Sequence, residues 1–265
     1  MLTLITALIA GMAAGMIVGY SSNNTALSVI IGIAVMMAVQ IIIGIIIRRK
    51  VNKVNMLIQS QLQEVQAKIQ RKVNMMQQKP GMSPKFMQAT VEKEQAVAVH
   101  QALEIADTLK RFYLWSPLLA KQINTMKMMF HYQIKEFDKV DELMSKCLFF
   151  DPTSQAMRIA RMYKKNDETL DKFADSKLKR AKGEQGVLLY ALYSWILVKR
   201  NDIKKAIDVL AASKKRCDNE VLNANWERLV NGKAKNFSNA QLGEMWYMLH
   251  LEEPKVKTQR MRPQF

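Results

Sequence analysis

The chain has 265 residues, a formal net charge of +17 and two cysteines, Cys147 and Cys217. Two cysteines are too few for a disulfide-stapled secreted domain, and their spacing matches no zinc motif. The charge is divided unevenly, because residues 1–47 contain no Asp, Glu, Lys or Arg and the whole excess of cations belongs to the rest of the chain. This division predicts that the two parts lie in different solvents.

Two apolar, charge-free segments open the chain, at residues 1–20 and 26–47. Each is about long enough to cross ~30 Å of hydrocarbon as a helix that rises about 1.5 Å per residue. The polar sequence SSNNT at 21–25 leaves room only for a tight turn. We therefore expect a transmembrane helical hairpin over residues 1–47. A buried hairpin in a soluble core is the less favoured alternative, and a signal peptide is disfavoured because the N-terminus lacks a basic segment.

Small residues recur at every fourth position in both segments, a spacing that lets helix backbones approach closely in lipid. We expect these positions to pack inside the hairpin, with oligomerisation through one of them as the alternative. Gln40 is the one strongly polar side chain deep in either segment, and the lack of an ionisable group argues against a transport pathway. The candidate packing residues are Gly11, Gly15, Gly19, Gly32, Gln40 and Gly44.

A cluster of cations follows the second segment directly, whereas the 21–25 turn has none. The members of this basic anchor are Arg48, Arg49, Lys50 and Lys53. Because cations near span ends stay in the cytoplasm, the cluster predicts cytoplasmic N- and C-termini for a two-pass protein. The short external turn suits a bacterial inner membrane best.

Residues 48–79 predict a basic amphipathic stalk helix, because one helical face is apolar. That face carries Val51, Val54, Ile58, Leu62, Val65, Ile69, Val73 and Met76. Three uses for it stay open: a parallel coiled coil, packing on the protein's own C-terminal domain, or lying along anionic lipid headgroups. The sequence KPGMSP at 79–84 then predicts a linker.

Residues 80–253 show helical periodicity and no convincing strand, so the expected fold class is all-α. No glycine occurs between Gly81 and Gly183, which excludes a glycine-rich phosphate loop there. A helix over 219–231 should end at Gly232, and the sequence SNAQ at 238–241 predicts a capping box that opens a last helix through His250. Residues 254–265 read as a basic tail.

Two stretches repeat the same helical pattern, FDKVDELMSKCLFFDP at 137–152 and IKKAIDVLAASKKRCDN at 203–219. With the helices before them they resemble the tetratricopeptide repeat (TPR) family, over roughly residues 121–219. The cleanest copy departs from the family pattern at Asp218, where a closing proline is usual, and Lys127 replaces a small residue in the first copy. The resemblance implies a TPR-like α-solenoid of helical hairpins for residues 80–253.

In that family the first helix of each repeat lines a groove that holds an extended peptide. Carried over to this chain, the resemblance implies a groove rich in cations, methionine and aromatic side chains, suited to an acidic or C-terminal peptide. The candidate groove residues are Asn124, Met128, His131, Tyr132, Arg161, Lys164, Lys165, Trp195 and Lys199; Met157 and Ala191 occupy equivalent positions.

No motif predicts catalysis, a cofactor or a metal. His100, His131 and His250 lie far apart in sequence, without the ligand spacing that metal sites use, and Glu252 and Glu253 read as a solvated helix end. We expect a non-enzymatic membrane-anchored scaffold or adaptor that binds a protein partner. The alternative is a membrane-tethered nucleic-acid-binding protein, on the basis of the +17 charge alone. Homo-oligomers through the glycines or the stalk stay open.

Overall fold

The computed structural model describes residues 2–22, 24–77 and 84–254, and every regular element in these ranges is a helix. The all-α prediction is confirmed for this part of the chain. The chain forms two compact units, Met1–Leu148 (unit 1) and Phe149–Phe265 (unit 2). The boundary between them falls inside residues 80–253, which the sequence groups as one domain.

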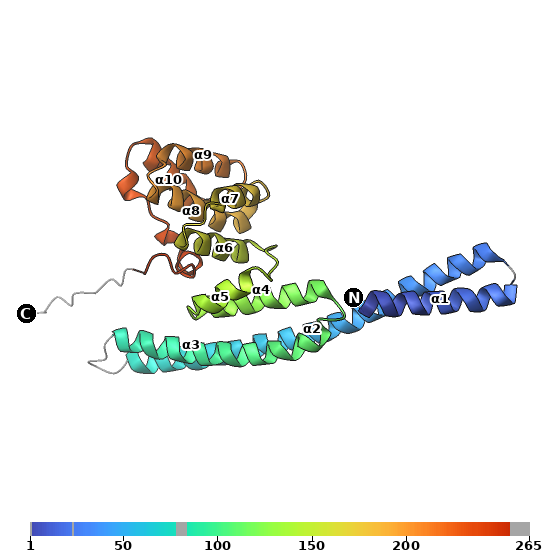
Figure 1. Cartoon of the computed structure of the whole chain (residues 1–265). Coiled ribbons are helices and arrows are strands. Elements are labelled where there is room, and N and C mark those ends of the chain that lie inside the picture. The colour runs from blue at the N-terminus through green and yellow to red at the C-terminus, as the bar shows by residue number, and fades with distance from the viewer. Residues whose placement is uncertain (1, 23, 78–83, 255–265) are drawn as a thin grey trace, which may run out of the picture. The chain divides into compact units, whose positions relative to one another are not determined.

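Unit 1 begins with α1 (Leu2–Ser22) and α2 (Thr25–Gln77), and both are long and apolar enough to cross a membrane. α1 lies along the first part of α2 (Figure 1). The turn between them is shorter than the predicted 21–25 segment, because both helices extend into it. Asn24 caps the start of α2, where its Oδ1 accepts a hydrogen bond from the Leu27 N–H (3.2 Å).

α2 continues without a break from its apolar part into the stalk. No proline interrupts residues 25–77, so nothing removes a backbone hydrogen bond along this helix. α3 (Pro84–Asp107) returns along the second part of α2 (Figure 1). The predicted linker at 79–84 lies outside the described residues apart from Pro84, which begins α3.

The apolar face of the stalk packs on the chain's own helices. Ile58, which is 3% exposed, contacts Ala102 and Ala106 of α3, and Val54 and Leu62 flank it. Partly buried residues of the following helix α4 (Pro117–Gln133) complete this core. Of the three uses that the sequence leaves open for the stripe, intrachain packing is the one present in unit 1.

The rest of unit 1 consists of a short 3-10 helix η1 (Thr108–Phe112), α4 and α5 (Phe137–Met144). Ser116 caps α4, with its Oγ accepting from the Leu119 N–H at 3.3 Å. Lys127, the residue that departs from the repeat pattern, is buried and forms an ion pair with Asp107 at the end of α3. Its ammonium group therefore ties α4 to α3.

Unit 2 contains five helices of eight residues or more within its described part: α6 (Pro152–Lys164), α7 (Leu170–Leu178), α8 (Gly183–Lys199), α9 (Ile203–Lys214) and α10 (Glu220–Val230). α8 is the centre of this unit, because it packs against α6, α7 and α9 and all of residues 186–197 are buried. Asp151, Asp202 and Asn219 cap their helices with side-chain oxygens. α10 ends as predicted, with Gly232 at φ +69°.

The predicted last helix through His250 is wrong. The chain instead forms 3-10 turns η2 (Ala234–Asn236) and η3 (Ala240–Leu242) and a single turn, α11 (Glu244–Tyr247). Gly243 has φ +59° and ψ −132°, a conformation that interrupts a helix and that side chains with a Cβ rarely adopt. The Ser238 hydroxyl oxygen accepts from the Ala240 N–H at 3.3 Å, whereas a capping box would need the Gln241 N–H, and the neighbouring Asn239 is fully buried with its amide bonded to the Ala191 carbonyl oxygen. The predicted basic tail lies outside the described residues beyond Pro254.

Candidate functional site

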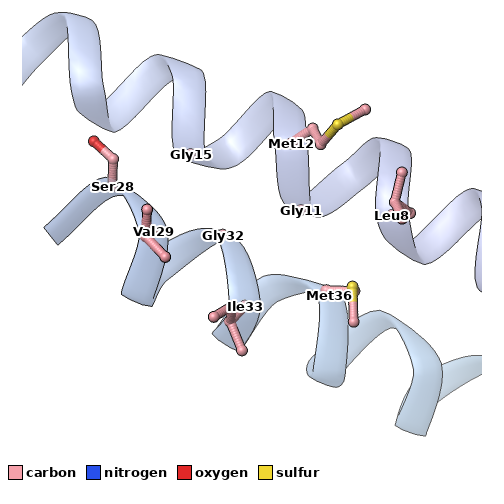
Figure 2. A pocket seen from close by; sticks show the side chains of 9 residues that line it. All are labelled: Leu8, Gly11, Met12, Gly15, Ser28, Val29, Gly32, Ile33 and Met36. Atoms are coloured by element: carbon pink, nitrogen blue, oxygen red, sulfur yellow. The ribbon is translucent and has the colours of Figure 1, made fainter. Parts of the chain in front are cut away.

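The helices α1 and α2 meet through backbone contact at their glycines. A Cβ atom built on Gly11 would lie 2.6 Å from the Gly32 carbonyl oxygen, and one on Gly15 would lie 3.1 Å from the Ser28 carbonyl oxygen. Gly19 packs on the Ser28 side chain. Figure 2 shows the facing glycines of the two helices. The small-residue faces are therefore used inside the chain.

One side of this contact is an open apolar groove of about 380 Å³ (Figure 2). Its lining comes from both helices and is almost entirely hydrocarbon: Leu8, Gly11, Met12, Gly15, Ser28, Val29, Gly32, Ile33 and Met36. The groove can offer a neighbour dispersion contact but almost no hydrogen bonds. Gly44 takes no part in the helix contact, since a Cβ there would meet nothing within 4 Å.

The start of α1 is tied to the segment between η1 and α4. The Leu2 N–H donates to the Leu114 carbonyl oxygen at 3.0 Å, and the Thr3 hydroxyl donates to the Trp115 carbonyl oxygen at 2.9 Å. The first N–H groups of a helix have no intrahelical partners, and the bond from Leu2 supplies one of them with an acceptor. The two bonds also hold the beginning of the hairpin beside residues 112 positions later in the chain.

Side chains of the same segment pack on α2 at the end of its charge-free part. Leu109, Leu119 and Ile123 form a core against Ile47, Val51 and Val54. Two neighbours point outward, because Leu114 is 70% exposed and Leu118 is 53% exposed. The sequence reasoning did not single out this segment. The sequence feature that could have indicated it is the run FYLWSPLL at 112–119, which lies between cations. Aromatic residues beside cations are a pattern typical of segments at a membrane–water interface.

A cavity of about 540 Å³ lies where these elements meet, and we call it the junction cavity. α2 contributes the largest share of its lining, and the other walls come from the start of α1 and from residues 115–122. The lining residues are Thr3, Gln40, Gly44, Ile47, Arg48, Val51, Asn52, Trp115, Ser116, Leu119 and Gln122. Arg48 is the only one of them with a formal charge, so the cavity combines one cation, several amides and apolar walls.

The four residues of the basic anchor are all exposed on α2. Only Arg48 lines the junction cavity; Arg49, Lys50 and Lys53 do not. Gln40, Gly44, Arg48 and Asn52 follow one another at four-residue spacing, so they share one face of α2. The sequence predicted Gln40 and Gly44 as helix-packing residues, and the structure instead brings them together with Arg48 at the cavity.

The candidate groove residues of unit 1 have different environments. Met128 and Tyr132 are buried, and the Asn124 amide donates to the Lys146 carbonyl oxygen at 3.4 Å. The imidazole Nδ1 of His131 lies 2.6 Å from a carboxylate oxygen of Glu136. Burial lowers the pKa of His131, although Glu136 acts to raise it.

The candidate groove residues of unit 2 lie on α6 and α8. Lys164, Lys165 and Lys199 are exposed and Arg161 is half-buried. Trp195 is only 6% exposed, and the Lys199 ammonium nitrogen lies 5.2 Å from the centroid of its ring. Trp195 therefore belongs to the core, and the edge of its ring that carries the indole N–H can bond to a polar group.

That edge holds a carboxylate of the same chain. The indole N–H of Trp195 donates to one oxygen of Glu252 at 2.8 Å, and the indole N–H of Trp246 donates to the other oxygen, also at 2.8 Å. Tyr163, Trp195 and Trp246 stack edge-to-face, with centroid distances of 5.5 and 5.6 Å. We call this group the tryptophan pair site. The expectation that Glu252 is a solvated helix end is wrong, since both its oxygens are bound.

No protein-family model, curated protein or solved structure matches the chain. Within the described residues, no group of three or more His, Cys, Asp and Glu side chains is placed to hold a metal ion.

Proposed function

We propose that the protein is a membrane-anchored scaffold or adaptor, and that its TPR-like helical part binds an acidic segment of a protein partner in an inner-membrane assembly. The hairpin of α1 and α2 would fix the chain in a bacterial inner membrane with both termini in the cytoplasm. Anchoring confines the binding part near its partner and raises the effective concentration.

The orientation is supported by two independent features. The cations that begin at Arg48 favour the cytoplasmic side. The hydrogen bonds from Leu2 and Thr3 to Leu114 and Trp115 require the start of α1 and the segment before α4 to lie on the same side of any membrane that the hairpin crosses.

The observation that carries the choice of partner is the tryptophan pair site. Two indole N–H groups hold the two oxygens of one carboxylate, and the exposed cation Lys199 lies over the Trp195 ring. Lys164 and Lys165 close α6, whose Tyr163 belongs to the same aromatic group. A partner carboxylate that displaces Glu252 would find the same donors, and the lysines would add charge-assisted hydrogen bonds.

The helix pairs α6–α7 and α8–α9 support a TPR-like array within unit 2, because the two helices of each pair follow one another after a short turn and contact each other. In such an array α6 and α8 are the helices that line the groove, and they carry the candidate residues of this unit.

A quantitative co-purification tests the partner assignment. The full-length protein would be extracted from its native membranes in mild detergent, and its co-purifying proteins compared with those of a variant in which Lys164, Lys165 and Lys199 are changed to Glu. A matched control changes Lys204, Lys215 and Lys233 to Glu, which are exposed residues with the same total charge change. We expect a defined partner to be lost from the first variant and kept by the second.

Equal retention of that partner by both variants would contradict the groove, and equal loss would show that only net charge matters. The variant Glu252→Gln sharpens the result. Because it removes the chain's own carboxylate from the tryptophan pair site, we expect partner binding to strengthen.

The orientation has its own test. A cysteine at Asn24 should react with a membrane-impermeant maleimide in intact spheroplasts, and one at Lys215 should react only after permeabilisation, in a background without Cys147 and Cys217. The opposite pattern would overturn the orientation without affecting the partner assignment.

A further inference from the structure

The junction cavity lies at the level where the chain leaves its charge-free part. Arg48 is the first charged residue of the chain, and the apolar residue before it, Ile47, lines the same cavity. If α2 crosses the membrane, as the proposed function requires, this cavity lies at the height of the lipid headgroups.

The lining of the cavity is suited to an anion with an apolar extension. The Arg48 guanidinium and the amides of Asn52 and Gln122 supply N–H donors near one another, and a guanidinium matches the oxygens of a phosphoryl group. Ile47, Val51 and Leu119 supply the apolar wall. Gln40 lies two helical turns deeper than Arg48, about 12 Å along the helix axis.

The absence of side-chain volume at Gly44 keeps this face of α2 open. Gly44 lies between Gln40 and Arg48 on the same helical face, and a Cβ there would meet nothing within 4 Å. A Cβ at Gly11 or Gly15 would instead press on the backbone of α2. The notch at Gly44 is therefore space in the cavity and not a contact surface between helices.

In the described part of unit 1, no carboxylate is paired with Arg48. Residues 1–63 contain no Asp or Glu, and neither do residues 108–133, which supply the opposite wall. The nearest acid before that wall, Asp107, is paired with Lys127 and Lys110. Among the described residues, no ion pair involving Arg48 is formed. The Thr3 hydroxyl is already bonded to the Trp115 carbonyl oxygen, and the Ser116 hydroxyl oxygen to the Leu119 N–H.

We infer that the junction cavity binds the phosphoryl group of an anionic membrane phospholipid, with Arg48 and the neighbouring amides on the phosphoryl oxygens and an acyl chain passing the Gly44 notch. The bound lipid would fill the space between α2, the start of α1 and the Trp115 segment. It would thereby act as a structural part of the junction that links the hairpin to α4.

Native mass spectrometry of the full-length protein in detergent tests this inference. The protein would be titrated separately with phosphatidylglycerol, with phosphatidylcholine and with inorganic phosphate. We expect the anionic lipid to be retained most strongly. The variant Arg48→Gln should weaken its retention at least about tenfold, the effect of losing a charge-assisted hydrogen bond.

Two further variants separate the cavity from general surface charge. Arg49→Gln removes an adjacent exposed cation that does not line the cavity and should change retention less than about twofold, well below the tenfold that one such bond contributes. Gly44→Leu places a side chain in the notch, where its Cβ meets no neighbouring atom within 4 Å, and should weaken retention as much as Arg48→Gln. Helical circular dichroism and size-exclusion profiles would show that each variant is folded.

Equal effects of the Arg48 and Arg49 variants, or unchanged retention in Gly44→Leu, would overturn the site. Retention of inorganic phosphate in place of the lipid would overturn the assignment to a lipid. Because maleimide labelling measures the membrane topology separately, failure of lipid binding is distinguishable from failure of the proposed orientation.

Discussion

The first part of α2 and the helix α8 are both strongly apolar, but the structure treats them in opposite ways. In α8 every residue from 186 to 197 is buried by neighbouring helices. In the most apolar 18-residue window of α2, no residue is buried inside the chain. Exposed hydrocarbon costs about 25 cal/mol per Å² in water, so the surface of α2 lacks the protein cover that stabilises α8. Composition alone does not separate a core helix from a membrane helix, whereas the partners available to each helix do.

The same two regions also differ in how their helices touch. α1 and α2 meet at glycines, with backbone against backbone. α8 meets its neighbours through large side chains such as Tyr190, Tyr193 and Leu197. Contact through small residues is typical of helices that pack in lipid, where no hydrophobic force pushes them together.

The largest expected effect is a difference in stability between two matched substitutions, one in α8 and one in α2. Leu192→Ala in α8 removes a side chain that is 0% exposed and should destabilise unit 2 by about 2–5 kcal/mol. Ile33→Ala in α2, where the side chain is 51% exposed, should change stability by less than about 0.5 kcal/mol in detergent. Denaturant unfolding followed by tryptophan fluorescence measures both. Equal losses of stability in the two variants would contradict the difference in burial between α8 and α2.

The next effect concerns the glycine contact. Gly11→Leu places a side chain against the Gly32 backbone, so the helices must separate, at a cost of about 1–3 kcal/mol. Spin labels on Ile5 and Ile41, both exposed, should report a longer and broader distance distribution. Gly44→Leu is the control and should leave the distribution unchanged. An unchanged distribution in Gly11→Leu would mean that the hairpin is not packed through this face.

A polar contact in the core of unit 2 should have a comparable or smaller effect. The buried amide of Asn239 donates to the Ala191 carbonyl oxygen of α8 and accepts from Asn225, both at 2.9 Å. Asn239→Ala removes both of these buried hydrogen bonds and should cost about 1–3 kcal/mol in unfolding free energy. The exposed Asn236→Ala serves as control. Similar stabilities of the two variants would contradict a structural role for this contact.

The smallest effect is a pH dependence in unit 1. Burial lowers the pKa of His131 below 6.5, so the unfolded chain takes up its proton first as the pH falls. Stability from this group is therefore present above about pH 6.5 and lost below it. Burial acts to raise the pKa of Glu136, but hydrogen bonds from His131 and Lys139 outweigh it, so that the pKa is lowered and acid removes this contribution too.

The measurement compares hydrogen exchange of α4 and α5 between pH 8 and pH 5.5. Wild type should lose more protection than His131→Gln as the pH falls. The charges that face this site also include His100, which lies 3.3 Å from Glu136. His100→Gln is therefore a second control, and a wild-type profile that matches His131→Gln but not His100→Gln would contradict the assignment.

Much of the helical layout could be predicted because its causes are local. Caps such as Asp151 with Pro152, and the left-handed Gly232, mark helix ends through interactions within a few residues. The failed prediction is also instructive. The sequence SNAQ at 238–241 has the residues of a capping box, but the Ser238 hydroxyl accepts from the Ala240 N–H instead of the Gln241 N–H, and Gly243 interrupts the helix.

The junction cavity and the tryptophan pair site could hardly be predicted from the sequence. Nothing local indicates that Leu2 bonds to Leu114, or that Glu252 lies between Trp195 and Trp246. Gly44 is a further example. Its four-residue spacing from other small residues predicts helix packing, but a Cβ at this position would meet no atom within 4 Å.

The sequence by itself determined that the chain is helical, that its first part is free of charge, and where cations begin, because periodicity and charge are properties of neighbouring residues. Only the tertiary structure decided which apolar helix is covered, which glycines touch and which polar groups meet at the junction cavity and the tryptophan pair site. Those outcomes depend on contacts between residues as far as 112 positions apart, and no local pattern specifies which faces will meet.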